Sequence, residues 1–151
     1  MARSKKKAIT EFDVSKRKGV VQAEQTGGYF KHIPTFSFSR YDKTAPWLKN
    51  QDNRPTIDSV LEVLYGYSGQ TWAQIYSATG GRRHGTNSHH IDVMNLSKEA
   101  QEQANEISLN EGRLFSLRLG GTIRLFGIIE PNGCFFVIWF DPNHEVCPDI
   151  R

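Results

Sequence analysis

Three apolar runs separated by glycine-bearing turns constrain this chain more than any other feature of its sequence. Residues 113–144 read RLFSLRLGGTIRLFGIIEPNGCFFVIWFDPNH, with Gly120-Gly121 after the first run and Pro131-Asn132-Gly133 after the second. Short apolar runs bounded by such residues are typical of strands joined by tight turns, because glycine adopts the backbone angles that hairpins need. Residues 113–144 therefore predict an antiparallel β-meander of three strands.

The register of the first hairpin follows from its side chains. A two-residue Gly-Gly loop mixes apolar and charged residues on each face of the sheet. A three-residue loop over 119–121 instead pairs Arg118 with Thr122 and Ser116 with Arg124. Because a one-residue slip moves every side chain to the other face, the cleaner partition predicts the longer loop. One face then carries Phe115, Leu117, Ile123 and Leu125, and the other carries Ser116, Arg118, Thr122 and Arg124.

The second turn extends this argument to the third strand. It pairs Glu130 with Cys134 and Arg124 with Phe140, so residues 141–144 leave the sheet beside Arg124. The third run, CFFVIWF, is apolar on both faces, which is typical of a central strand that is covered on each side.

Two arginines, an aspartate and a histidine are thus predicted at one end of the sheet. The guanidinium groups of Arg118 and Arg124 match phosphate oxygens and stay charged at any working pH. General acid-base cleavage of RNA by its own 2′-hydroxyl requires a side chain that can gain or lose a proton, and histidine is the usual one, so His144 is the candidate acid or base and Asp141 is placed to orient its ring. The alternative is structural: Arg124 pairs with Glu130 or another carboxylate, and His144 caps a turn.

Helical periodicity precedes the meander. Apolar residues recur every three or four positions from 57 to 66, where Gly66 ends a first helix. A second helix over 70–78 is capped by Ser68, and a third over 97–109 by Ser97. The first helix is expected to bury Ile57, Val60, Leu61 and Leu64. An antiparallel β-meander packed against an N-terminal helical pair and one further helix is an α+β fold.

The chain before the helices divides into an arm and a strand. Residues 29–42, YFKHIPTFSFSRYD, alternate aromatic and polar side chains and predict a half-buried strand. Residues 1–28 lack periodicity and predict a flexible basic arm, which leaves 29–151 as a single domain. Residues 1–18 carry a net charge of +5, against −2 for the rest. The arm is either a solvated tail or binds RNA phosphates, with Lys5, Lys6 and Lys7 as candidates.

Composition excludes several classes of protein. The two cysteines, Cys134 and Cys147, form no CxxC metal pair and no disulfide framework. No apolar run approaches the roughly 20 residues that cross a bilayer, and no apolar segment follows the basic start as in a secretory signal. We therefore expect a cytoplasmic protein that has no membrane association and no cofactor.

The segment GRRHGTNSHH holds a second polar cluster, which is predicted to bind nucleic acid through Arg82, Arg83, His84, His89 and His90. Successive residues of a strand point to opposite faces, so at most one of His89 and His90 faces a given site. A solvated loop is one alternative. Another is a zinc site that combines one of these histidines with His144 or Cys147, although the spacing fits no standard pattern. The preceding helical pair is either a packing hairpin or a DNA-binding helix-turn-helix.

The pattern LFSLRLGGTIRLFGII, a turn, CFFVIWF and a polar end with histidine resembles the RelE/ParE superfamily of bacterial toxins. This resemblance covers mainly residues 113–146. It implies an antiparallel sheet packed by a helical pair, messenger RNA cleavage in the ribosomal A site for RelE-type members, and action on gyrase for ParE-type members. Arg118 and Arg124 match arginines that contact RNA phosphate, and His144 lies where such enzymes place a catalytic or phosphate-binding group. The chain is longer than typical members and lacks meander lysines and the tyrosine that some RelE toxins use.

Three hypotheses follow. The first is a cytoplasmic RelE-like endoribonuclease with Arg118, Arg124, Asp141 and His144 at its site, RNA or the ribosome as partner, and a cognate antitoxin. The second is a non-catalytic nucleic-acid-binding protein that uses the arm and the Arg/His segment. The third is a protein-binding inhibitor of the ParE type.

Overall fold

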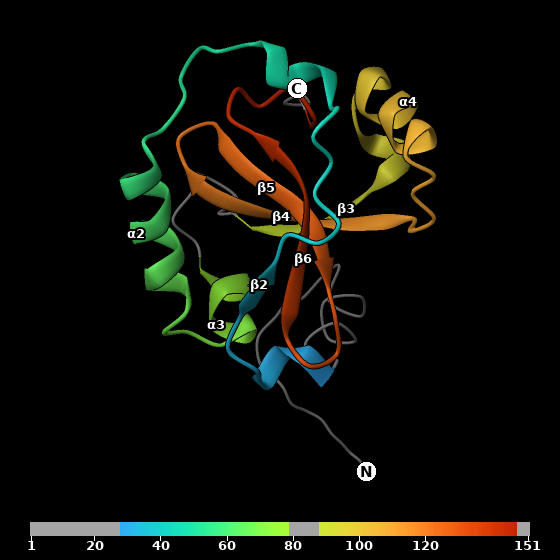
Figure 1. The fold of residues 1–151 in the computed structure, drawn as a ribbon. Coiled ribbons are helices and arrows are strands. Elements are labelled where there is room, and N and C mark those ends of the chain that lie inside the picture. Colours follow the sequence, from blue (N-terminus) through green and yellow to red (C-terminus); the bar gives the residue numbers. More distant parts are fainter. Residues whose placement is uncertain (1–27, 79–87, 148–151) are drawn as a thin grey trace.

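The chain folds as an α+β protein around a five-stranded mixed sheet (Figure 1). This computed structural model describes residues 28–78 and 88–147. The strand order is β2-β6-β5-β4-β3. The strands are β2 (Thr35–Ser37), β3 (His89–Asp92), β4 (Arg113–Gly120), β5 (Ile123–Ile129) and β6 (Cys134–Asp141).

Within the described residues the sheet is accompanied by α2 (Ile57–Tyr67), α3 (Trp72–Ser77) and α4 (Lys98–Glu106). Short 3-10 helices span Gly28–Lys31, Pro46–Lys49 and Val93–Asn95. Across these described ranges, no helix has both the length and the apolar character needed to span a membrane. The predicted helical pair is present as α2 and α3, and the predicted further helix is present as α4.

The helix caps agree with the sequence in one case and differ in two. The side chain of Ser97 accepts from the backbone N–H of Ala100 and caps α4, as predicted. α3 is capped by Thr71 and not by Ser68, because Thr71 and Gln74 form a reciprocal capping box. α2 continues through Gly66 to Tyr67, so the predicted left-handed glycine stop is wrong.

The meander is confirmed, but the sheet around it is not purely antiparallel. β4, β5 and β6 pair antiparallel in sequence order, whereas β2 joins β6 in parallel. The strand predicted over 29–42 is only three residues long in the structure, as β2. A 3-10 helix takes up the beginning of this segment, and Phe38, just after β2, is 57% exposed. β6 lies between two strands, as its two apolar faces predicted.

The first hairpin keeps its predicted faces but not its register. Arg118 lies opposite Arg124, and Ser116 lies opposite Phe126, two positions from the predicted pairs. Gly120 pairs with Ile123 across a tight turn, and the register shifts between Arg118 and Gly120. Gly120 and Gly121 both have positive φ, at 117° and 52°, so two glycines close a shorter turn than the one predicted.

A bulge alters the second hairpin. Ile129 pairs with Phe135, which continues the predicted register, but the pairing shifts between Phe126 and Gly127. Arg124 therefore lies opposite Asp141 and not opposite Phe140. A Cβ atom on Gly127 would meet the carbonyl oxygen of Phe136, so this strand glycine permits the close backbone approach at the bulge.

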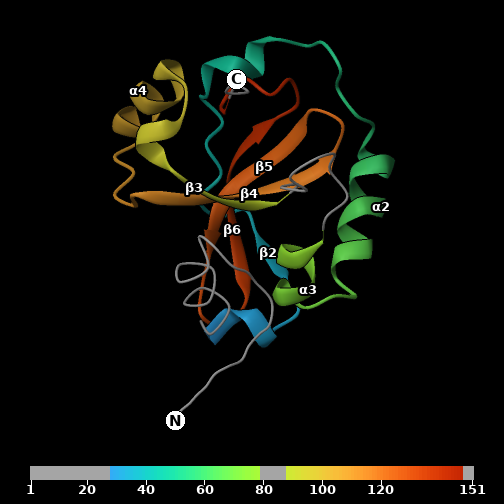
Figure 2. The same ribbon diagram turned by 180° about the vertical axis from the view of Figure 1, so that it is seen from behind.

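Two apolar clusters cover the two faces of the sheet. Figures 1 and 2 show α4 on one side and α2 with α3 on the other. The α4 face is built on Trp139 and Phe126, and the α2/α3 face on Trp72 and Phe115. All three tryptophans, Trp47 included, are at most 2% exposed and belong to the core.

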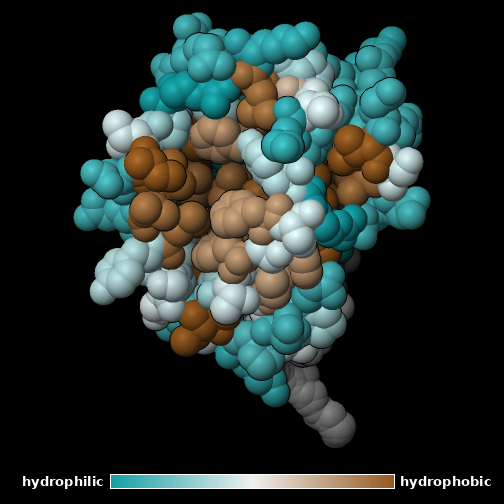
Figure 3. Space-filling view, viewed as in Figure 1, coloured by the Kyte–Doolittle hydropathy of each residue, from teal (hydrophilic) through white to brown (hydrophobic). Residues whose placement is uncertain are grey.

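α2 packs with only part of its predicted face. Val60 and Leu64 contact the core beneath the helix, whereas Ile57 and Leu61 are 70% and 55% exposed. Figure 3 shows apolar side chains gathered over this helix. The prediction that all four residues are buried is wrong, because α2 turns Val60, Val63 and Leu64 toward the core and leaves Ile57 and Leu61 exposed.

Candidate site at the β4–β5–β6 end

Three predicted site residues form one row across the sheet. Arg118 lies opposite Arg124, and Arg124 lies opposite Asp141, on the face that α4 covers. In the next row His89 lies opposite Ser116, which lies opposite Phe126. Because residues two apart in a strand share a face, His89 and the two arginines project from the same side of the sheet.

The two arginines differ in their surroundings. Nη1 of Arg124 donates to the carbonyl oxygens of Gly121 and Ile123, at 2.8 and 3.0 Å, so its guanidinium lies against the hairpin tip. Arg118 is fixed through its backbone, which accepts from the Tyr67 hydroxyl at 2.6 Å and donates to Ser88 Oγ at 3.0 Å. Helix α2 therefore fixes the strand end from which the Arg118 side chain projects.

Asp141 organises the turn that follows β6. Its side chain is 0% exposed. Its Oδ1 accepts from the backbone N–H of Glu145 at 2.9 Å, and its Oδ2 accepts from that of Val146 at 2.8 Å. Burial raises the pKa of Asp141, although these hydrogen bonds and the charge of His144 act in the opposite direction. The structure thus gives Asp141 a positioning role in the turn.

His144 occupies a constrained position within that turn. Its φ is 61°, a left-handed conformation that non-glycine residues adopt only where their surroundings hold them. Thr122 Oγ1 donates to the carbonyl oxygen of Pro142 at 2.7 Å and ties the turn to the β4–β5 tip. The half-buried His144 imidazole therefore stands near both the arginine hairpin and Asp141.

His89 is the group whose proton state the structure defines best. Its Nδ1 lies 3.0 Å from the carbonyl oxygen of His90. A carbonyl only accepts, so Nδ1 carries the proton and Nε2 of the neutral ring presents a lone pair. Burial lowers the pKa of His89, as do the charges of Arg124 and His144, while the hydrogen bond to His90 raises it. The ring is thus a neutral proton acceptor at pH 7.

His90 does not join this cluster. It lies opposite Phe115 on the other face, where its Nε2 is 3.2 Å from the Tyr29 hydroxyl. The rings of Phe115 and Tyr76 surround it, with centroids 5.0 and 6.1 Å away. The structure therefore separates the two neighbouring histidines and packs His90 among aromatic rings on the α2/α3 face.

The remaining predicted site residues lie outside the described residues. These are Lys5, Lys6, Lys7, Arg82, Arg83 and His84. Within residues 28–78 and 88–147, no three histidine, cysteine, aspartate or glutamate side chains are placed to hold a metal ion. The helix-turn-helix alternative fails on α3, which has six residues and buries Trp72 and Ile75.

No protein-family model, curated protein or solved structure matches this chain. The site is therefore defined by its own geometry: two opposed arginines, a neutral imidazole beside them and a second imidazole in the adjoining turn. The sequence predicted His89 as one of several nucleic-acid-binding residues of the segment GRRHGTNSHH, and did not place it beside Arg118 and Arg124. Its place became evident once β3 was paired with β4, which put His89 beside Ser116.

Proposed function

We propose that this protein is a cytoplasmic, RelE-like endoribonuclease that binds an RNA phosphodiester at Arg118 and Arg124. The observation that carries the proposal is the position of His89, a neutral ring with a lone pair on Nε2, on the same face as the two opposed arginines. Two like charges directly opposite each other in a sheet repel, and a phosphate bound between them removes that cost.

In the proposed reaction His89 Nε2 accepts the proton of the 2′-hydroxyl next to the scissile phosphate. The 2′-oxygen forms a bond to phosphorus as the bond from phosphorus to the 5′-oxygen breaks. His144 gives its proton to the departing 5′-oxygen, and the arginines stabilise the charge on the phosphoryl oxygens. The products are a 2′,3′-cyclic phosphate and a 5′-hydroxyl end. This assigns the base role to His89 and the acid role to His144.

The proposed partners follow from this chemistry and from the resemblance to RelE. The substrate is single-stranded RNA or messenger RNA on the ribosome, and a cognate antitoxin protein would hold the activity in check. The basic residues Lys5, Lys6, Lys7, Arg82 and Arg83 would add contacts to phosphates along the strand.

The test is cleavage of a labelled single-stranded RNA, alone and as messenger RNA on ribosomes, by the full chain and by single variants. We expect RNA with a 2′-hydroxyl to be cut to a cyclic phosphate end and its 2′-O-methyl analogue to stay intact. His89→Ala and His144→Ala should each abolish growth arrest on induced expression. Arg118→Ala should weaken RNA binding.

The matched control for Arg118 is Arg113, at the other end of the same strand. Arg113 is exposed and lies 3.5 Å from Asp92, so Arg113→Ala should bind and cut RNA as the unaltered protein does. If the unaltered protein and all its variants bind the RNA and leave it uncut, the nuclease is refuted and the non-catalytic nucleic-acid-binding protein is the remaining RNA-binding hypothesis. Growth arrest that persists in both histidine variants would refute the nuclease.

A further inference from the structure

The turn that carries His144 is bound from outside by a second segment of the chain, residues 50–54. The side-chain amide of Asn143 faces this segment with both of its polar atoms. Its Oδ1 accepts from Nδ2 of Asn53 at 2.8 Å, and its Nδ2 donates to the carbonyl oxygen of Asp52 at 3.1 Å. We call these two hydrogen bonds the amide clasp. It joins the segment 50–54 to the turn immediately before His144.

The same segment also contacts the residue that follows His144. Nδ2 of Asn50 donates to Oε2 of Glu145 at 3.0 Å. His144 therefore lies between two residues that are both bound to one segment, and its own φ is 61°. A non-glycine residue keeps such a left-handed conformation only where its surroundings fix it. The contacts on either side of His144 supply that constraint.

The segment 50–54 is itself firmly attached, so it can support the turn. Nη2 of Arg54 donates to the carbonyl oxygens of Leu48 and Asn50, at 2.6 and 3.3 Å. The Arg54 guanidinium also lies over the ring of Phe140 in β6, 5.6 Å from its centroid. The end of the segment is thus fixed both to its own beginning and to the strand that leads into the turn.

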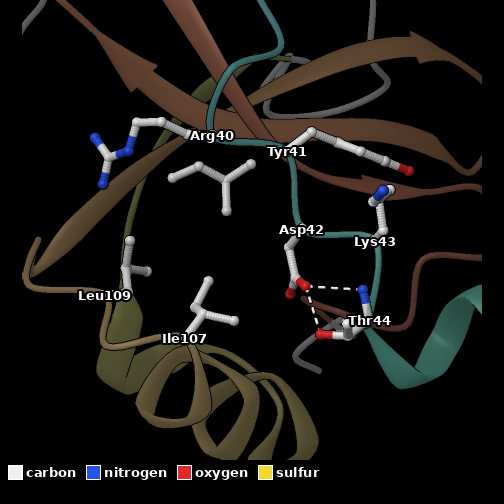
Figure 4. Close-up of a pocket in the computed structure, with 8 residues that line it drawn as sticks. Arg40, Tyr41, Asp42, Lys43, Thr44, Ile107 and Leu109 are labelled. Atoms are coloured by element: carbon white, nitrogen blue, oxygen red, sulfur yellow. Dashed lines mark hydrogen bonds between the residues drawn. The ribbon is translucent and has the colours of Figure 1, made fainter.

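The chain that leads into this segment is anchored in the core. Oδ1 of Asp42 accepts from N and Oγ1 of Thr44 at 2.9 and 2.7 Å, drawn as dashed lines in Figure 4. Its Oδ2 accepts from Nε1 of the buried Trp139 at 2.8 Å. In the 3-10 helix that follows, Nε1 of Trp47 donates to the carbonyl oxygen of Phe140 at 3.0 Å. Core contacts therefore fix the support of the amide clasp.

We propose that Asn53 and Asn143 are positioning residues for His144, and that the amide clasp keeps its imidazole beside the two opposed arginines. Both asparagines act through the backbone of the turn. The consequence for catalysis rests on the proposed nuclease, in which His144 gives its proton to the departing 5′-oxygen. An acid held in one place reacts faster than one that samples many positions, because the cost of orienting it is met by folding.

NMR of the full chain tests the positioning without RNA. The one-bond coupling between Cα and Hα of His144 distinguishes positive from negative φ. Asn143→Ala removes both hydrogen bonds of the clasp, and Asn53→Gly removes one while suiting the φ of 57° at that position. We expect the coupling to move toward its negative-φ value in both variants, and further in Asn143→Ala. The matched control is Ser108→Gly, at a left-handed residue after α4 with φ of 56°, which should leave the coupling unchanged.

RNA cleavage gives the second measurement. Both clasp variants should lower the cleavage rate by about 10- to 100-fold and leave RNA affinity unchanged, because Arg118 and Arg124 stay in place. An unchanged His144 coupling in Asn143→Ala would overturn the proposal, as would normal cleavage in a variant whose coupling has moved. If the unaltered protein leaves RNA intact, the nuclease fails, and the coupling alone then decides whether the clasp holds the turn.

Discussion

The two faces of the sheet use adjacent histidines in opposite ways. On the α2/α3 face, His90 is packed among Phe115, Tyr76 and Tyr29. On the α4 face, His89 stands in a row beside Ser116, next to the row of opposed arginines. One residue of chain therefore separates a ring that completes the core from a ring held near positive charges.

This difference teaches that strand alternation distributes chemistry as well as apolar surface. The α2/α3 face is closed by aromatic packing from Trp72 and its neighbours. The α4 face is apolar only up to Phe126 and Trp139, and beyond them Arg124 and Asp141 take the place of core side chains. The sheet thus has one structural face and one face that is polar at its far end.

Single substitutions of the two histidines should give the largest difference, which is in the rate of RNA cleavage. His89→Ala removes the proposed base and should lower RNA cleavage by about 10²- to 10⁴-fold, the range typical of general acid-base catalysis. His90→Phe keeps an aromatic ring in the core and should cut RNA at close to the normal rate. Cleavage rates and melting temperatures of both variants check this, and equal losses of activity would erase the distinction between the faces.

Truncation of the aromatic core should cost the most stability. Trp72 is fully buried, and its Nε1 donates to the carbonyl oxygen of Gly133 at 2.8 Å. We expect Trp72→Ala to lower the free energy of unfolding by about 3–5 kcal/mol in urea denaturation, as for other buried aromatic truncations. A loss below that of an exposed control, Tyr65→Ala, would show that this face is not the structural one.

Asp141 should contribute stability through the turn it holds. Removal of its carboxylate leaves two backbone N–H groups, of Glu145 and Val146, without their acceptor. We expect Asp141→Ala to lower the free energy of unfolding by about 2–3 kcal/mol, the cost of buried donors left unsatisfied. RNA cleavage should fall as well, since His144 depends on this turn. A variant with normal stability and reduced activity would instead make Asp141 a participant in the chemistry.

The pH dependence of stability should be the smallest effect. The folded pKa of His89 lies below its unfolded value near 6.5, so the unfolded chain binds the extra proton first. Stability should therefore fall as pH drops below about 6.5 and level off below the folded pKa. His89→Gln should flatten this part of the curve in urea titrations at several pH values. An unchanged curve would assign the effect to other groups.

The sequence predicted the meander and its faces because glycine turns and strict alternation are local signals. It missed the register of the first hairpin and, beyond the bulge, that of the second. The first depends on Gly120 and Gly121 both adopting positive φ, and the second on the bulge opposite Gly127. A lone glycine inside an apolar strand was the available sign of that bulge.

The candidate site was predicted in part. Arg118 shares a face with Ser116 because the two residues are two apart in β4. Arg124 lies directly opposite Arg118 in β5 and therefore projects from the same face. The role of His89 was not predictable, because it depends on the pairing of β3 with β4, a contact with no local signature. The contacts of Asp141 with Glu145 and Val146 are local, but its position opposite Arg124 depends on the bulge in the pairing of β5 with β6.

Nitrogen-15 NMR of the histidine side chains during titration with an uncleavable 2′-O-methyl RNA tests the central claim most directly. The account predicts a free protein in which His89 is protonated on Nδ1 alone at pH 7, and a His89 resonance that moves on RNA binding while that of His90 stays in place. RNA binding that leaves His89 unperturbed, or that shifts His90 instead, would contradict it.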